Sequence, residues 1–422
     1  MKVRQICMMV LFGLGVIPAM QAQTFDKLWK EVEQAEKKSL PKTVIKLTDE
    51  IYQKGEKERN SAQMLKAYMW RMKTQDILTP DSFYVGLRDL EQWAKQTEQP
   101  MDRAILHSLI AEFYANYAAD NQWQLRQRTE IVGETPSADI REWTANMFVE
   151  KVRTNVKEAL ADSLLLLKTS SRNYIPFVEL GETSEYYHHD MYHLLASRAI
   201  RALNQIERLE RGSFNGITVS PVKQDIINIY ERMSDAYETA GLKEGYVLTM
   251  LQYLEWERGN DNKWQPVQLK KGLGEWTADT YNAALDELKR QFKSEPICAE
   301  VYLAQARYAV EKMQQVNALQ LCDEAIRLYP GYRRINALKN LREEILAPFL
   351  NVSAVSQAFP NEEIKLNVGH KNLDGFTVRL YQAKKLVKEQ HYSVLRPKDY
   401  RAKDTVFTFK APDLGTYVMR II

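Results

Sequence analysis

The sequence predicts a mainly α-helical protein in which an array of helical hairpins is followed by a C-terminal antiparallel β-sandwich. Three observations support this prediction. Apolar residues recur at helical spacing over most of the 422 residues. Alanine and proline positions repeat at a fixed interval before Pro330. After Pro348, apolar and polar residues alternate as they do in half-buried strands.

The clearest hairpin lies between residues 299 and 330 and has the small-residue spacing of a tetratricopeptide (TPR) unit. The residues that carry this pattern are Tyr302 and Ala306 in the first helix, Ala318 and Ala325 in the second, and Pro330 at the end. A step of 34 residues back, the usual length of this repeat, places Ala284 under Ala318 and Pro296 under Pro330. One such hairpin cannot bury its apolar face alone, so we expect stacked neighbours.

Composition and charge describe a folded protein with no preference for nucleic acid. Hydrophobic residues make up 45% and charged residues 27% of the chain, which argues against global disorder. The formal net charge is +3, and it falls to +1 if Lys2 and Arg4 are removed. So small a charge gives no support for nucleic-acid binding.

Residues 1–22 have the pattern of a secretory signal peptide. Lys2 and Arg4 precede an apolar run from Ile6 to Ile17, and small residues follow up to Ala22. The run is shorter than the roughly 20 residues that a membrane span requires, although a membrane anchor is the alternative. We therefore expect an exported chain without a stable membrane span.

Two cysteines remain after this segment, Cys298 and Cys322. In the hairpin arrangement Cys298 precedes the first helix and Cys322 lies about two turns into the second. Such positions are too far apart for a disulfide, which needs Cα atoms within roughly 4.4–6.8 Å. We expect two free, largely buried thiols, with a disulfide as the alternative.

The N-terminal helical region is predicted to extend over 23–212. Its expected helical segments are 23–40, 41–57, 61–77, 82–96, 101–119, 139–167 and 185–211, with a loop at 168–183. Gly55 is expected to cap the end of the second helix. The Gly- and Pro-containing stretch 211–222 marks the clearest internal boundary.

TPR-like helical repeats are predicted for 213–347 and the β-sandwich for 348–422, with an incomplete sandwich as the alternative. The repeats begin with a hairpin of 224–241 and 242–258 and end with a helix at 332–346. In the β region, the strand patterns start at Leu350, Ile364, Phe376, Val406 and Tyr417, so five or six strands can be counted.

The sharpest candidate for chemistry is the pair His189 and His193. These two residues share a face of a helix and could hold a metal, with Asp190 where zinc metalloproteases of the HExxH type carry a glutamate. No convincing third ligand follows, so the favoured interpretation is an ordinary helix start. An enzyme that uses the pair would carry stoichiometric zinc.

Other candidate motifs are interpreted as structural. Lys271–Glu275 has two glycines but lacks the full phosphate-binding pattern, and His107 is expected to be a satisfied core or edge histidine. There is no Gly-x-Ser-x-Gly elbow and no cysteine in an activated context. A set of aromatic residues at helical spacing is expected to pack in the core rather than to form a ligand cage: Tyr114, Tyr117, Trp123 and Trp143.

Short stretches over nearly the whole chain carry a family likeness. They are 40–43, 111–114, 121–123 with Arg128 and Thr129, 143–148, 192–199, 359–362 and 379–381. In these stretches the chain resembles the N-terminal region of bacterial alpha-2-macroglobulin family proteins of the Bacteroidetes type. The resemblance implies a signal peptide, a helical TPR-like region and then macroglobulin-like β-sandwich domains.

The resemblance also implies a cell-envelope protease inhibitor. In that family a protease cuts a bait segment, the inhibitor changes shape, and some members couple to the protease through a thioester formed within a Cys-x-Glu-Gln motif. This sequence contains no such motif, and no bait segment or thioester domain can be placed in it.

We therefore expect a non-catalytic N-terminal scaffold of an alpha-2-macroglobulin-like endopeptidase inhibitor, located in the periplasm or outer cell envelope. It would have no catalytic residues, no cofactor and no metal, and it would act by protein–protein contacts. The partner would be a protease, an envelope protein or the remainder of a longer inhibitor. The alternative is a stand-alone periplasmic TPR adaptor.

Overall fold

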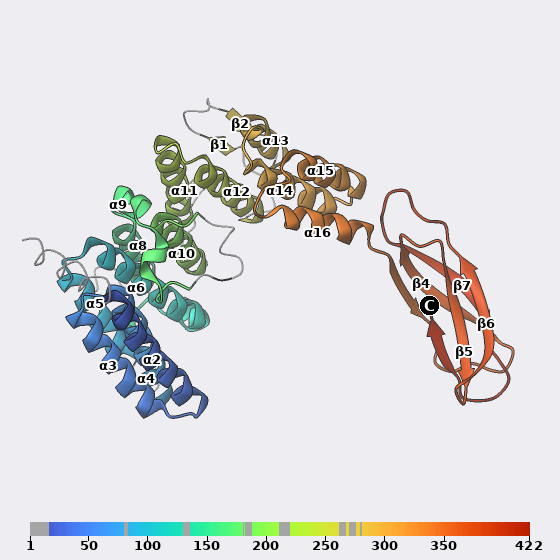
Figure 1. Cartoon of the computed structure of the whole chain (residues 1–422), viewed down its shortest axis with the longest axis horizontal. Helices are drawn as coiled ribbons and strands as arrows, with labels where there is room; N and C mark the ends of the chain where they lie inside the picture. The colour runs from blue at the N-terminus through green and yellow to red at the C-terminus, as the bar shows by residue number, and fades with distance from the viewer. Residues whose placement is uncertain are drawn as a thin grey trace, which may run out of the picture. The chain divides into compact units, whose positions relative to one another are not determined.

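The computed structural model describes residues 17–79, 83–129, 136–179, 181, 188–210, 220–260, 267–269, 276–278 and 281–422. The chain divides into two compact units, Met1–Met250 and Leu251–Ile422. It is mainly helical with a C-terminal antiparallel β region, as the sequence predicts (Figure 1). The boundary expected between residues 212 and 213 lies outside the described residues, and so does most of the proposed signal peptide.

Three helices open the first unit: α2 (Ile17–Lys37), α3 (Pro41–Lys57) and α4 (Ser61–Leu78). Proline stands at the first position of α3, where its missing N–H costs nothing. The side chain of Asn60 caps α4 by accepting from the amide of Gln63 at 3.2 Å. Their apolar faces form one core cluster of Phe25, Leu28, Trp29, Val32, Ala35, Val44, Ile51 and Ala67.

The expected role of Gly55 as a C-terminal cap is wrong. Gly55 lies buried inside α3, and the left-handed residue beyond the helix is Arg59, with φ 53°. A Cβ at position 55 would meet Cγ of Met64 at 3.0 Å. Glycine is therefore used here for the close approach of α3 to α4 rather than for its backbone freedom.

The remaining helices of the first unit follow with two short 3₁₀ turns, η2 (Ile140–Glu142) and η3 (Ser171–Tyr174). They are α5 (Phe83–Gln96), α6 (Pro100–Asp120), α7 (Gln122–Gln127), α8 (Ala145–Ala159), α9 (Ser163–Lys168), α10 (Met191–Glu207), α11 (Pro221–Thr239) and α12 (Lys243–Asn260), the last of which continues into the second unit. α6 packs against both α8 and α10, which makes it the central helix of this half.

The single long segment expected over 139–167 is wrong, because it consists of η2, α8 and α9. Asp139 accepts from the amide of Arg141 at 2.9 Å and so starts η2. Asp162 accepts from the amide of Leu165 at 3.0 Å and starts α9. Each aspartate satisfies a free N–H at a new helix start, and this local bond competes with continuing the previous helix.

The second unit contains α13 (Tyr281–Phe292), α14 (Cys298–Glu311), α15 (Gln315–Leu328) and α16 (Ile335–Leu346), each packed against the next (Figure 1). Two short strands, β1 (Val267–Leu269) and β2 (Trp276–Ala278), precede them. The alanines that were expected to seat the helices are completely buried: Ala284, Ala306, Ala318 and Ala325. Small residues at these contacts let the helix axes approach closely.

Both cysteines of the second unit are free and buried, as predicted. Burial raises the pKa of Cys322 to about 11 and also raises the pKa of Cys298. Both thiols therefore stay protonated at neutral pH and pack as small apolar groups.

Six strands follow α16: β3 (Phe349–Ser353), β4 (Glu363–Lys371), β5 (Gly375–Gln382), β6 (Lys385–Ser393), β7 (Lys403–Lys410) and β8 (Val418–Ile421). They form two antiparallel sheets with strand orders β3-β4-β7 and β6-β5-β8. One hydrophobic cluster contains inward side chains from both sheets: Ile364, Leu366, Val368 and Phe409 from the first, and Phe376, Val378, Leu380 and Tyr392 from the second.

The β region is attached to the end of α16 by side chains at the end of β4 and in the β4–β5 turn. Asn372 donates from Nδ2 to the carbonyl oxygen of Ile345 at 2.9 Å and to that of Ala347 at 3.3 Å. Lys371 donates to the carbonyl oxygen of Glu344 at 2.8 Å. These bonds satisfy carbonyl groups that the helix end leaves open.

Candidate functional site

The prediction that His189 and His193 share a face of a helix is wrong, because α10 begins at Met191 and only His193 lies in it. His193 is completely buried, and Asp190 immediately precedes the helix. Within the described part of the chain, no group of three His, Cys, Asp or Glu side chains is placed to hold a metal ion.

Asp190 performs the structural role that was the favoured interpretation. Its Oδ1 accepts from the amide of His193 at 2.7 Å, which caps α10. Its Oδ2 accepts from the hydroxyl of Tyr237 in α11 at 2.8 Å and is also hydrogen-bonded to Nδ1 of His188. Burial, and then the nearby carboxylate, raise the pKa of Tyr237. Asp190 therefore joins α10 to α11 and holds a helix start.

The prediction for His107 is confirmed, because its Nδ1 is hydrogen-bonded to Oδ1 of Asn155 at 2.8 Å between α6 and α8. The motif Lys271–Glu275 lies outside the described residues.

The aromatic residues divide into packed and exposed members. Tyr114 stacks on Trp143 with ring centroids 5.2 Å apart, and Tyr117 stacks on Phe148 at 5.4 Å, as expected for core packing. For Trp123 the prediction is wrong, since its side chain is 74% exposed on the short helix α7. A six-residue helix at the surface has too little neighbouring structure to cover an indole.

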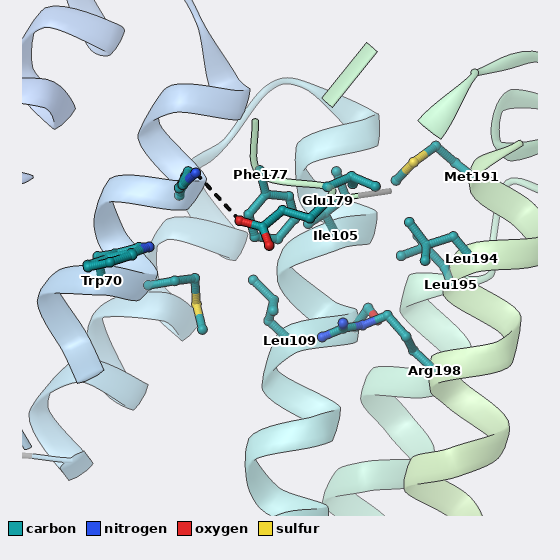
Figure 2. A pocket seen from close by; sticks show the side chains of 13 residues that line it. Trp70, Ile105, Leu109, Phe177, Glu179, Met191, Leu194, Leu195 and Arg198 are labelled. Carbon is teal, nitrogen blue, oxygen red and sulfur yellow. Dashed lines mark ion pairs between the residues drawn. The ribbon is translucent and has the colours of Figure 1, made fainter. Parts of the chain in front are cut away.

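The first unit also contains a cleft of about 340 Å³ that no sequence motif predicted. Its walls come from α4, α6 and α10 and from the segment after η3 (Figure 2). The apolar lining consists of Met69, Trp70, Ile105, Leu109, Phe177, Val178, Met191, Leu194 and Leu195. Most of this lining on α6 and α10 is buried, so the cleft has a firm apolar floor.

Two ion pairs lie at the cleft. Lys66 of α4 forms an ion pair with Glu179 at 3.6 Å, drawn as the dashed line in Figure 2. Arg198 extends from α10 toward Leu109 in Figure 2 and pairs with Glu112 of α6. The cleft thus combines an apolar interior with a few charged groups, two cations and their carboxylate partners, and small-ligand sites usually have such a mainly apolar lining with few polar groups.

A hydrogen-bonded contact holds the walls together near the first turns of α4 and α6. Asp102 of α6 is buried and accepts from the hydroxyls of Ser61 and Tyr174, the latter at 2.9 Å. Burial, followed by the Asp102 carboxylate, raises the pKa of Tyr174. The cleft opens one to three turns further along both helices, where Lys66, Trp70 and Leu109 lie.

One polar group in the cleft has no partner within the described residues. The Ser108 side chain lines the cleft and the residue is 5% exposed, yet its hydroxyl makes no hydrogen bond. Buried hydroxyls are normally satisfied, so this group calls for an explanation.

The chain was compared with protein-family models and with curated proteins. No protein-family model matches it, and no curated protein matches it. None of the helices in the described ranges is both long and apolar enough to cross a membrane.

Proposed function

We propose that this chain is a non-catalytic scaffold that works by protein–protein contacts, made mainly by its C-terminal β region. In the form suggested by the family resemblance, it is the N-terminal scaffold of a cell-envelope alpha-2-macroglobulin-like endopeptidase inhibitor. The helical hairpins would then be TPR-like and the β region a macroglobulin-like sandwich. A stand-alone periplasmic adaptor is the alternative that the experiments below distinguish.

The observation that carries this proposal is the excess of exposed apolar side chains on the β region. Of the nineteen large hydrophobic residues that are exposed among those described, ten lie beyond α16. They are Phe349, Val355, Phe359, Leu386, Val387, Leu395, Val406, Leu414, Val418 and Ile422. Single exposed apolar residues are ordinary, but a concentration of them in one small region indicates an interaction surface.

Strand register places several of these residues at one end of the sheets. Phe349 pairs with Lys371 at the end next to α16, whereas Glu363 pairs with Lys410 at the opposite end. The loops 354–362 and 411–417 both belong to that opposite end, and the amide of Ala411 donates to the carbonyl oxygen of Glu362 at 2.8 Å.

We call Val355, Phe359 and Leu414, which lie in these two loops, the apolar tip. Their exposed fractions are 62%, 79% and 88%. Burial of apolar area contributes about 25 cal/mol per Å², so a partner that covers the apolar tip would gain from it. A phenylalanine at the centre of an interface is a typical anchor.

The first experiment tests for inhibition. The purified chain is incubated with a folded reporter protein and each of several endopeptidases of different specificity, and cleavage of the reporter is followed over time. Slower cleavage by several enzymes supports the inhibitor form. Unchanged cleavage, together with recovery of a stable partner from an envelope extract, supports the adaptor form.

The second experiment tests whether the apolar tip makes the contact. The double variant Phe359→Ser/Leu414→Ser is compared with Met313→Ser/Val316→Ser, which removes two exposed apolar side chains from the helical hairpins of the same unit. We expect binding or inhibition to fall at least tenfold in the first variant only. Equal behaviour of the two variants would contradict the proposal.

A further inference from the structure

We propose that the cleft between α4, α6 and α10 binds a small ligand in which an apolar body carries a carboxylate. This site is separate from the apolar tip and does not depend on the proposed scaffold function. Four features support it: the size of the cleft, its apolar lining, its cations and one unsatisfied hydroxyl.

The size and lining fit the body of such a ligand. The volume of about 340 Å³ lies at the lower end of the range of about 300–1,000 Å³ that is usual for ligand pockets. Met69 of α4 and Met191 of α10 both line the cleft. Methionine side chains are flexible and adapt to apolar ligands of different shape.

Lys66 favours an anionic group at one side of the cleft. Its ammonium lies 3.6 Å from a carboxylate oxygen of Glu179, whose side chain is 80% exposed. An ion pair with so exposed a partner contributes little to stability, because water competes for both charges. A ligand carboxylate could replace Glu179 as the partner of Lys66 at little cost (Figure 2).

Ser108 supplies the observation that points most directly to a ligand. Its hydroxyl is buried on α6, lines the cleft and has no hydrogen-bond partner among the described residues. Leaving a buried polar group unsatisfied costs free energy, whereas a ligand oxygen within reach would satisfy it. A carboxylate, which only accepts hydrogen bonds, matches a hydroxyl that has a hydrogen to donate.

Arg198 adds a second cation at the cleft. It is paired with Glu112, but a guanidinium has five donors and can bind a further oxygen without giving up that pair. Lys66 and Arg198 line the same apolar space, and each has donors beyond its pair with Glu179 or Glu112 that an anionic ligand can use better than a neutral one. The charges therefore favour an acid over an alcohol or an amide of the same size.

The same chemistry can come from a fatty acid or from the C-terminal residue of a peptide. Two pairs of probes separate these sources while testing the shared chemistry. Decanoate is compared with decanol, and acetyl-Phe-Leu with a free carboxylate is compared with its C-terminal amide. Binding to the full chain is measured by titration calorimetry.

We expect at least one of the two acids to bind tenfold or more tightly than its neutral partner, because charge-assisted hydrogen bonds are about twice as strong as neutral ones. The acid that binds identifies the source. Equal affinity within each pair, or no binding of either acid, would overturn the proposal.

Matched variants test the residues. Lys66→Met removes the cation but keeps an apolar chain over the ring of Trp29, which the ammonium covers at 4.8 Å. Lys73→Met is the control, because Lys73 also lies on α4, pairs with Glu36 at 3.0 Å and covers Trp70 at 5.3 Å, but does not line the cleft.

We expect Lys66→Met to weaken binding of the acid about tenfold and Lys73→Met to leave it unchanged. Ser108→Ala should weaken binding by a smaller factor while the protein melts at the same temperature or higher. If both lysine variants bind the acid alike, or if Ser108→Ala binds it as tightly as the original chain, the assigned geometry is wrong.

Discussion

The helical part and the β region use their apolar residues differently. In the helices, small side chains such as Ala284 and Ala325 are completely buried, and buried polar groups hold neighbouring helices in place. Between the two sheets the core cluster consists of large branched and aromatic residues. On the outside, however, the β region exposes ten large apolar side chains, whereas the much longer remainder of the described chain exposes nine.

This difference indicates which part of the chain has apolar surface left over for a partner. The helices bury most of their apolar faces against other helices, and the large apolar side chains that they leave exposed are spread over a much longer stretch of chain. The β region fills its own interior and still has apolar side chains left over. We therefore expect substitutions inside the helices to change stability, and substitutions on the β surface to change association.

The largest effect is expected at Asp190. In Asp190→Ala the amide of His193 loses its cap and the buried hydroxyl of Tyr237 loses its acceptor. These losses should lower the free energy of unfolding by about 3 kcal/mol in urea denaturation. Asp190→Asn keeps an acceptor oxygen and should cost about 1 kcal/mol. Equal losses in the two variants would show that the hydrogen bonds are not what stabilises this contact.

A second test uses neighbouring alanines of α13. Ala284 is completely buried and Ala283 is exposed. Ala284→Leu should destabilise the protein by about 2 kcal/mol, because extra methylene groups do not fit a close helix contact. Ala283→Leu should change stability by less than about 0.5 kcal/mol. Thermal melting of both variants checks the difference, and similar melting would contradict close packing of the hairpin.

A smaller effect should appear as a dependence on pH. Glu300 is buried in α14, where it accepts from Arg334 at 2.7 Å and from Tyr332 at 2.9 Å. Burial raises the pKa of Glu300 above 4.5, although Arg334 lowers it in part. The folded chain then binds this proton more tightly than the unfolded chain does, so this group makes stability fall as pH rises from 4.5 through the folded pKa.

Glu300→Gln lacks this titration. Its free energy of unfolding should therefore increase relative to that of the original chain as pH rises through the same window. At higher pH, the difference between the two proteins should stay constant. Urea denaturation at a series of pH values from about 4 to 8 measures the two curves. A difference that stays constant across the window, or changes in the opposite direction, would contradict the direction given for Glu300.

The smallest effect on stability is expected at the apolar tip. Phe359→Ser/Leu414→Ser should shift the free energy of unfolding by less than about 0.5 kcal/mol, because both side chains lie in water. A loss of more than 1 kcal/mol, about the mean cost of a substitution, would mean that these residues belong to the core instead.

Helical periodicity predicted most helices well, because the faces that it detects are the faces that pack. Pro41 and the buried alanines of the hairpins had the expected roles. The break before α9 was missed, since Asp162 looks like any exposed residue of an amphipathic run until its carboxylate is seen to cap a helix. Strand β6 was missed because it lies at a sheet edge and carries lysines next to its few apolar residues.

The cleft could not have been predicted from local pattern. It depends on residues as distant in the sequence as Lys66 and Arg198 and on a gap between helices that no spacing rule describes. Ser108 is an ordinary residue within an apolar run, and only its missing hydrogen bond in the folded chain sets it apart. An ordinary helix start was the favoured interpretation of the histidine stretch, but the expected helix over 185–211 included Asp190, so its role as the cap before α10 was not predicted.

The register of the β region has a mechanical consequence. Phe349, which begins β3, and Ile422, whose amide donates to the carbonyl oxygen of Thr377 at 3.0 Å, lie at the same end of the sheets as the 372–374 turn. Tension applied between these two points would load the outer strands from one end and open their hydrogen bonds in succession. The region should therefore yield at low force, while the loops at its far end carry no load.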